Sequence, residues 1–142
     1  MAIDYPRAFA ACKVGAEGGV AKSQYHLGHM YDDGNGVAQD FKQARVWYEK
    51  AAAQDHAGAF NNLGYMYDMG HGVAQDYKQA RVWYEKAAAQ DSPDAVNGLG
   101  VIYFEGKGVT PSWRRAREYY KRAIQLGHST ARKNLNTLIG FI

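Results

Sequence analysis

The sequence has little of what holds a disulfide-rich secreted domain or a membrane protein together. Its single cysteine, Cys12, allows no disulfide within the chain. No apolar run approaches the ~20 residues that a membrane-spanning helix needs, because glycine, aspartate or lysine interrupts each one. The first residues carry an early acid and no uninterrupted apolar core, so they do not form a secretory signal. We therefore expect a cytoplasmic protein from the sequence as written, and a periplasmic or secreted one if a signal peptide was removed.

Net charge is also low, at +3, but its distribution is uneven. Between Lys107 and Lys133 there are eight basic residues and one acid, a local charge of +7 that leaves −4 for the rest. Apolar residues make up 46% and charged residues 22% of the chain, which is typical of a globular domain and excludes a disordered one. The charge asymmetry gives a partner two electrostatically different surfaces to distinguish.

What the chain does have is internal repetition. Residues 39–55 and 75–91 agree at sixteen of seventeen positions, with an offset of 36. At this period a motif of Leu-Gly, a tyrosine and a Gly-x-Gly turn begins three times, at Leu27, Leu63 and Leu99. Half of the pattern also precedes the first copy and follows the third. A fixed period of this length is typical of a solenoid of stacked structural units.

Each repeat predicts two helices, as the second copy illustrates. Apolar residues from Ala57 to Asp68 recur at helical spacing, and Gly70 is placed to end that helix in a left-handed conformation. Asp76 is the expected N-cap of the next helix. We expect that helix to bury one stripe, formed by Ala80, Trp83, Tyr84, Ala87 and Ala88.

Glycine recurs in the middle of each first helix, at Gly28, Gly64 and Gly100. Glycine costs about 1 kcal/mol relative to alanine in a helix, so its recurrence indicates that a neighbour needs the space. Alanines on the second helix, such as Ala80, are the expected small partners. A helix pair this short cannot bury its apolar stripe alone, and stacking supplies the missing cover.

The second copy resembles the repeat pattern of the Sel-like repeat family, which is related to the tetratricopeptide repeats. The residues that carry the resemblance are Ala59, Leu63, Gly64, Tyr67, Gly70, Gly72, Val73, Asp76, Ala80, Trp83, Tyr84, Lys86, Ala87 and Ala88. The third copy departs most, with Ser112 in place of the aspartate and Tyr119 in place of the tryptophan. The chain also lacks the cysteines of the family's disulfide-stapled subgroup.

The resemblance implies an all-α fold: an α-solenoid of antiparallel helix pairs with period 36, wound as a right-handed superhelix. One domain, 1–142, is expected. Its parts are an N-terminal half repeat (1–20), three repeats (21–56, 57–92, 93–128) and a C-terminal capping helix (129–142). Members of the family are usually adaptors in bacterial signalling, secretion, host interaction or toxin immunity.

No residue pattern predicts catalysis or a cofactor. The Gly-x-Gly turns follow helices rather than strands, so they do not match a nucleotide-binding fingerprint. His26, His29 and Asp32 share one helix face and form the single candidate metal cluster, but the other copies do not repeat it. Cys12 aligns with Tyr48 and is expected to be a small buried thiol. We expect no metal, no cofactor and no enzyme.

The first helix of each pair lines the concave side in tetratricopeptide-like solenoids, so its free stripe is the expected partner-binding surface. Amide side chains there suit a peptide backbone because they both donate and accept hydrogen bonds. The expected contact residues are Tyr25, His26, His29, Asp32, Asn61, Asn62, Tyr65, Asp68, Asn97, Val101 and Phe104.

The leading hypothesis is therefore a scaffold that binds a protein or peptide on its concave face. The alternative is a nucleic-acid or anionic-surface binder that uses the basic run Arg114, Arg115, Arg117, Lys121 and Arg122. An enzyme with an unrecognised site is third. Apolar residues in both terminal half repeats also predict a possible homodimer through like ends.

Overall fold

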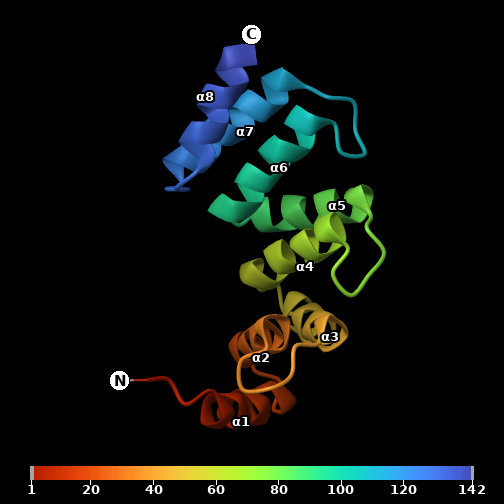
Figure 1. The fold of residues 1–142 in the computed structure, drawn as a ribbon, viewed down its shortest axis with the longest axis vertical. Coiled ribbons are helices and arrows are strands. Elements are labelled where there is room, and N and C mark those ends of the chain that lie inside the picture. Colours follow the sequence, from red (N-terminus) through yellow and green to blue (C-terminus); the bar gives the residue numbers. More distant parts are fainter. Residues whose placement is uncertain (1, 142) are drawn as a thin grey trace.

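A computed structural model describes residues 2–141, which form eight α-helices and no strand. The helices are α1 (Tyr5–Glu17), α2 (Ala21–Asp33), α3 (Phe41–Ala52), α4 (Ala57–Met69), α5 (Tyr77–Ala88), α6 (Pro93–Glu105), α7 (Trp113–Gln125) and α8 (Ala131–Phe141). They stack in chain order along one long axis, with the two termini at opposite ends (Figure 1). Each helix packs on the helices before and after it. The predicted all-α solenoid of helix pairs is confirmed.

The expected start and stop signals bound these helices. The Asp76 carboxylate accepts hydrogen bonds from the backbone N–H groups of Lys78 and Gln79 at 3.0 and 3.2 Å, so it caps α5. Gly70 ends α4 with φ 72° and ψ 37°, a left-handed conformation that an L side chain rarely adopts. The Asp40 and Gly34 positions repeat this arrangement one period earlier. Local sequence therefore sets the start of α3 and α5 and the end of α2 and α4.

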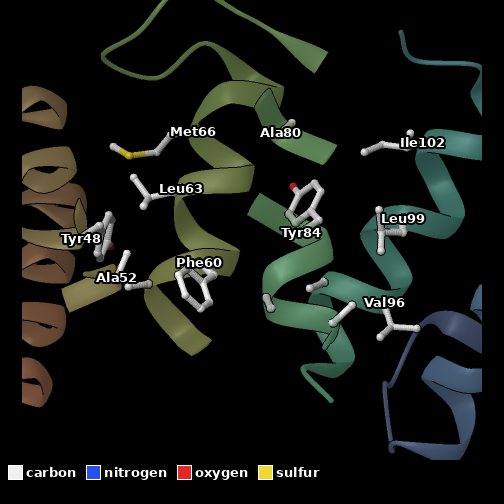
Figure 2. Packing of buried hydrophobic residues seen from close by; sticks show 14 of the residues in the cluster. Tyr48, Ala52, Phe60, Leu63, Met66, Ala80, Tyr84, Val96, Leu99 and Ile102 are labelled. Atoms are coloured by element: carbon white, nitrogen blue, oxygen red, sulfur yellow. The ribbon is translucent and has the colours of Figure 1, made fainter. Parts of the chain in front are cut away.

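The core runs continuously through the stack rather than forming a separate centre in each repeat. Leu63 on α4 is fully buried, and Tyr84 on α5 is nearly so. Figure 2 shows these side chains between the helices, with Tyr48 and Leu99 in the same layer on either side. Burial of one copy thus depends on the next, as expected for a solenoid.

Trp83 corrects the predicted core stripe of α5. The other four predicted members are buried, but Trp83 is only half-buried. Its ring stacks on Phe60 of α4, with the centroids 5.9 Å apart and the planes at 28°. Helical spacing alone placed it in the core, whereas the neighbouring Tyr84 takes the central position.

The mid-helix glycines make room for tyrosine rings rather than for the alanines of the second helix. A Cβ added at Gly64 would lie 2.6 Å from Cδ1 and 2.7 Å from Cε1 of Tyr84. Gly28 and Gly100 meet Tyr48 and Tyr120 in the same way. The expectation that a neighbour needs the space is therefore right, but the neighbour is aromatic.

The two ends of the stack differ in how much they bury. Helix α8 covers the third repeat with Ala131, Leu135 and Leu138, as its spacing predicts. At the other end Cys12 is half-buried and Val14 is exposed, so the expected buried thiol is partly open. The dimer hypothesis rests in part on the apolar C-terminal residues, of which Ile142 lies outside the described residues, so that hypothesis stays a prediction.

Candidate functional site: an amide-lined groove

A hollow of about 430 Å³ lies across the first helices of two consecutive repeats. Its walls come from α4 and α6, with Tyr84 at its base and the segment before α8 at its far side. The lining residues are Asn61, Asn62, Tyr65, Tyr84, Asp94, Asn97, Gly98, His128 and Thr130. We call this hollow the groove. It brings together four of the predicted contact residues: Asn61, Asn62, Tyr65 and Asn97.

The predicted residues of α2 form a cluster that adjoins the groove. His29 Nε2 lies 2.9 Å from the Tyr25 hydroxyl and 3.1 Å from Nδ2 of Asn62. Because the Asn62 amide donates, His29 Nε2 accepts and the ring carries its proton on Nδ1, 4.0 Å from Asp33 Oδ2. The Tyr25 ring also stacks on His56, with centroids 4.5 Å apart. Asn62 thereby joins the α2 cluster to the groove.

Partial burial favours the uncharged forms of Tyr25, His26 and His56. Burial raises the pKa of Tyr25. Burial, with a smaller effect from Lys22, lowers the pKa of His26, and burial with repulsion from His26 lowers that of His56. Neutral imidazoles and hydroxyls offer hydrogen bonds of both kinds, which suits recognition of polar but uncharged groups.

Two predicted contact residues, Asp32 and Asp68, instead support the packing. Asp68 is buried, 7% exposed; its Oδ2 accepts a hydrogen bond from Tyr84 Oη at 3.4 Å, and its Oδ1 lies 3.2 Å from Lys107 Nζ. Asp32 accepts from Tyr48 Oη at 3.1 Å. Burial and the adjacent carboxylates raise the pKa of both tyrosines. The expected partner contact of Asp68 does not fit these surroundings, because its oxygens are already used inside the fold.

The third repeat contributes less to the groove than the sequence suggests. Asn97 lines it, and its Oδ1 accepts a hydrogen bond from Asn134 Nδ2 of α8 at 2.9 Å. Val101 is half-buried and is not part of the lining. Phe104 faces the C-terminal end, where its ring lies 5.8 Å from that of Phe141. These two predicted contacts therefore lie beside the groove rather than in it.

Sequence reasoning missed His128 and Thr130, which close the far side of the groove. His128 Nε2 lies 3.1 Å from Asp94 Oδ1, which ties the start of α8 to the start of α6. The repeat offered a signal, because His128 is two periods from His56, and His56 already lies beside Tyr25. His56 and His128 thus share a repeat position, one beside the α2 cluster and the other in the groove.

The candidate metal cluster is not assembled. The side chains of His29 and Asp32 turn to different partners, Tyr25 with Asn62 and Tyr48 respectively. Within residues 2–141, no three His, Cys, Asp or Glu side chains come together as a metal site. Over the same residues, no helix is long and apolar enough to cross a membrane.

The basic run on α7 is divided between structural and solvent-facing residues. Arg115 Nη1 donates to the Tyr103 hydroxyl at 3.2 Å. Arg122 Nη2 binds the Ala88 carbonyl oxygen and the Asp91 carboxylate at 2.6 and 2.8 Å. Arg114, Arg115, Arg117 and Lys121 are exposed, and Arg122 is half-buried. Two of the five basic side chains, Arg115 and Arg122, are therefore already engaged by the fold.

Comparison with protein families finds three matches to the Sel1 repeat, at residues 21–56, 59–92 and 93–128. Over 58 residues the chain is also 37% identical to a chitin synthase regulator of Saccharomyces cerevisiae (strain ATCC 204508 / S288c). That alignment covers 41% of this chain and 8% of the yeast protein.

Solved structures share the architecture along almost the whole chain. A Sel1 repeat protein from Oxalobacter formigenes is 34% identical, with a TM-score of 0.89 over 94% of this chain and 55% of that one. A protective antigen of uropathogenic Escherichia coli strains, with an SLR fold, is 33% identical, with a TM-score of 0.90 over 97% of this chain and 30% of that one. Helicobacter pylori cysteine rich protein B, 23% identical with a TM-score of 0.69, shares the fold over 89% of this chain and 96% of its own. The chain thus spans about half or less of the first two structures.

Proposed function

The chain belongs to the Sel1 repeat family, and we propose that it is a non-catalytic scaffold whose groove binds an extended peptide segment of a partner protein. Helical scaffolds of this family generally serve protein interactions. The observation that carries the proposal is the set of three amide side chains, Asn61, Asn62 and Asn97, which two successive first helices place in one hollow.

Amide side chains suit a peptide backbone, whose N–H and C=O groups alternate along the chain. Each amide donates through nitrogen and accepts through oxygen, so an extended segment finds both functions along the groove. Tyr65, 47% exposed, adds a large ring that loses little conformational freedom on binding. Hydrogen bonds to the backbone supply affinity, and side chains of the partner at the groove's ends supply specificity.

The biological setting that we propose is an adaptor in bacterial signalling, secretion, host interaction or toxin immunity. The support is the kind of protein that resembles this chain. One is a protective antigen of pathogenic bacteria, and another is a regulator of an enzyme. A scaffold that holds a partner without chemistry of its own fits both descriptions.

Selection from a displayed library of random peptides of about ten residues tests the groove. Peptides that bind the protein should lose about 1–3 kcal/mol of affinity with the double substitution Asn61→Ala and Tyr65→Ala, measured by titration calorimetry. These two side chains are preferred to Asn97 because Asn97 is hydrogen-bonded to Asn134 and its removal would also disturb α8. Circular dichroism should show an unchanged fold.

The matched control carries Lys78→Ala and Gln79→Ala on the exposed side of α5, away from the groove. It should bind the same peptides normally. Equal binding by the folded groove variant and the control would refute the proposal. A strong decrease in affinity with added salt, removed by substituting Arg114 and Arg117, would instead support the anionic-surface alternative.

A further inference from the structure

A second cavity, of about 500 Å³, lies where α3 ends and the chain turns into α4. It shares no lining residue with the groove. Its lining includes Ala52 and Asp55, the aromatic rings of Phe60 and Trp83, and Lys86. Figure 2 shows Phe60 of α4 beside Ala52 at the end of α3. We call this cavity the junction pocket because it lies between the first and second repeats.

The next junction along the solenoid shows what such a place can hold. One period later the corresponding residues are Ala88, Asp91 and Arg122. There the Arg122 guanidinium donates to the Ala88 carbonyl oxygen at 2.6 Å and to Asp91 Oδ1 at 2.8 Å. The protein's own third repeat thus fills the equivalent position with an arginine side chain.

The acceptors of the two junctions have the same backbone conformation. Asp55 and Asp91 both adopt positive φ, 60° and 58°, and each donates its N–H at 2.9 Å to the alanine carbonyl three residues before. The near-identity of residues 39–55 and 75–91 explains this duplication. Yet within residues 2–141 no basic side chain forms an ion pair with the Asp55 carboxylate, whereas Arg122 pairs with Asp91. The first junction therefore presents the same acceptors without the guanidinium.

Lysine replaces arginine at this point and takes a different position. Lys86 Nζ lies 4.8 Å from the centroid of the Trp83 ring and 5.9 Å from that of Phe60. The aromatic walls therefore already attract a cation. An ammonium is a point charge on a flexible stem and does not reproduce the planar fork that joins a carbonyl to a carboxylate. Because Lys86 is exposed, it can move aside for an incoming side chain.

We propose that the junction pocket binds an arginine side chain presented by a partner protein. The guanidinium donates to the Asp55 carboxylate and the Ala52 carbonyl oxygen, and its aliphatic stem packs against Phe60 and Trp83. This contact goes beyond the proposed peptide groove, since the two surfaces share no residue. A partner that carries both an extended segment and a suitably placed arginine engages the scaffold at two points.

Titration with a blocked arginine, N-acetyl-arginine N-methylamide, tests the pocket by itself. In ¹⁵N NMR spectra the compound should shift the Trp83 indole N–H and the backbone amides of Asp55 and Phe60. The citrulline analogue has the same shape without the charge and should cause no such shifts. The lysine analogue should bind more weakly, because its ammonium cannot span both acceptors.

Matched substitutions in the two nearly identical copies provide the controls. Asp55→Asn keeps a residue that tolerates positive φ and should weaken binding of blocked arginine about tenfold, the loss expected for a charge-assisted hydrogen bond. Asp91→Asn, one period later, should leave that affinity unchanged because Arg122 already occupies its junction. Thermal melts check that both variants fold.

Lys86→Arg is the most direct test, because it rebuilds in the first junction the residue that fills the second. We expect it to abolish binding of blocked arginine while leaving the melting temperature unchanged or raised. Retention of full affinity by Lys86→Arg or by Asp55→Asn overturns the proposal. Equal binding by the citrulline analogue, or by the lysine analogue, also overturns it, since the pocket then does not recognise a guanidinium.

Discussion

The smallest unit of this fold is a glycine on one helix facing a tyrosine on the next. Gly64 and Tyr84 illustrate it: the ring lies where a Cβ would be, and its hydroxyl reaches the buried Asp68 of the same first helix. The tyrosine therefore fills space and also pairs a buried carboxylate, which would be costly without a partner. The glycine on the first helix and the tyrosine on the second helix of each repeat thus determine how closely the two helices approach.

Replacing Gly64 with alanine should lower the free energy of unfolding by about 1–3 kcal/mol, although alanine is the better helix former. The added methyl group would meet the Tyr84 ring at 2.6 Å, and that ring is buried and cannot move aside. Urea denaturation measures the change. Gly140→Ala in α8 is the control, since nothing lies within 4 Å of its new methyl group, and it should be neutral or stabilising.

A destabilisation by Gly64→Ala no larger than that of the control would mean that the ring and the glycine do not constrain each other.

The sequence indicated such a constraint at Gly64 but not its partner. The period of 36 shows which residues of the three repeats are equivalent. It does not show whether Ala80, Trp83 or Tyr84 occupies the space beside Gly64, because that depends on the direction of each side chain between the helices. Periodicity in one helix does not contain that information, and for this reason Trp83 was misplaced.

Among the elements, the first helices position the groove, and their N-caps differ from repeat to repeat. The N-cap of helix α4 is His56, whose Nδ1 accepts a hydrogen bond from the Ala59 N–H at 3.3 Å. Ser92 has the corresponding role in α6. An imidazole can accept at Nδ1 only while it is neutral, so α4 has a cap that depends on pH and α6 does not.

The protein should lose stability on acidification, and His56→Ser should reduce that loss. Burial, with repulsion from His26, lowers the folded-state pKa of His56 below its usual 6.5, so the unfolded chain takes up the proton first. The stability that this group contributes is thus complete above pH 6.5 and decreases as the pH falls through the folded-state pKa. Serine keeps a cap without the titration, so thermal melts at about pH 7.5 and about pH 5 should differ less.

Ser92→Ala is the matched control for the cap itself, since it should cost about 0.5–2 kcal/mol at both pH values. An unchanged pH dependence in His56→Ser would show that the cap of α4 does not sense protonation.

The sequence predicted the helix boundaries well, because caps and glycine stops are local signals. It did not predict the histidine at this cap, since the spacing of His56 and His128 has meaning only once the concave surface is known.

At the scale of the whole molecule, most contacts run between helices that follow one another in the chain, so the stack is close to one-dimensional. Sequence predicted this well, because a repeated motif determines a repeated contact. It predicted the groove less well. Asn61 and Asn97 follow the repeat and line the groove, while Asp68 is buried and Phe104 lies beside Phe141 at the C-terminal end. A binding surface combines residues from several different elements, and which of them lie together is known only from the three-dimensional structure.

A one-dimensional stack should be most stable in the middle, and amide hydrogen exchange should show it. Helix α1 buries only Ala16, α8 buries three residues, and α4 and α6 bury six each. Local opening costs more where more apolar surface is exposed, so protection should rise from α1 through α8 to α4 and α6. Exchange measured by mass spectrometry on peptides from each helix checks the order. The groove lies on the best-protected helices, so it should be formed before a partner arrives, and binding should cost little ordering. Equal protection in α1 and α4 would contradict this, because it would mean that the stack opens only as one unit.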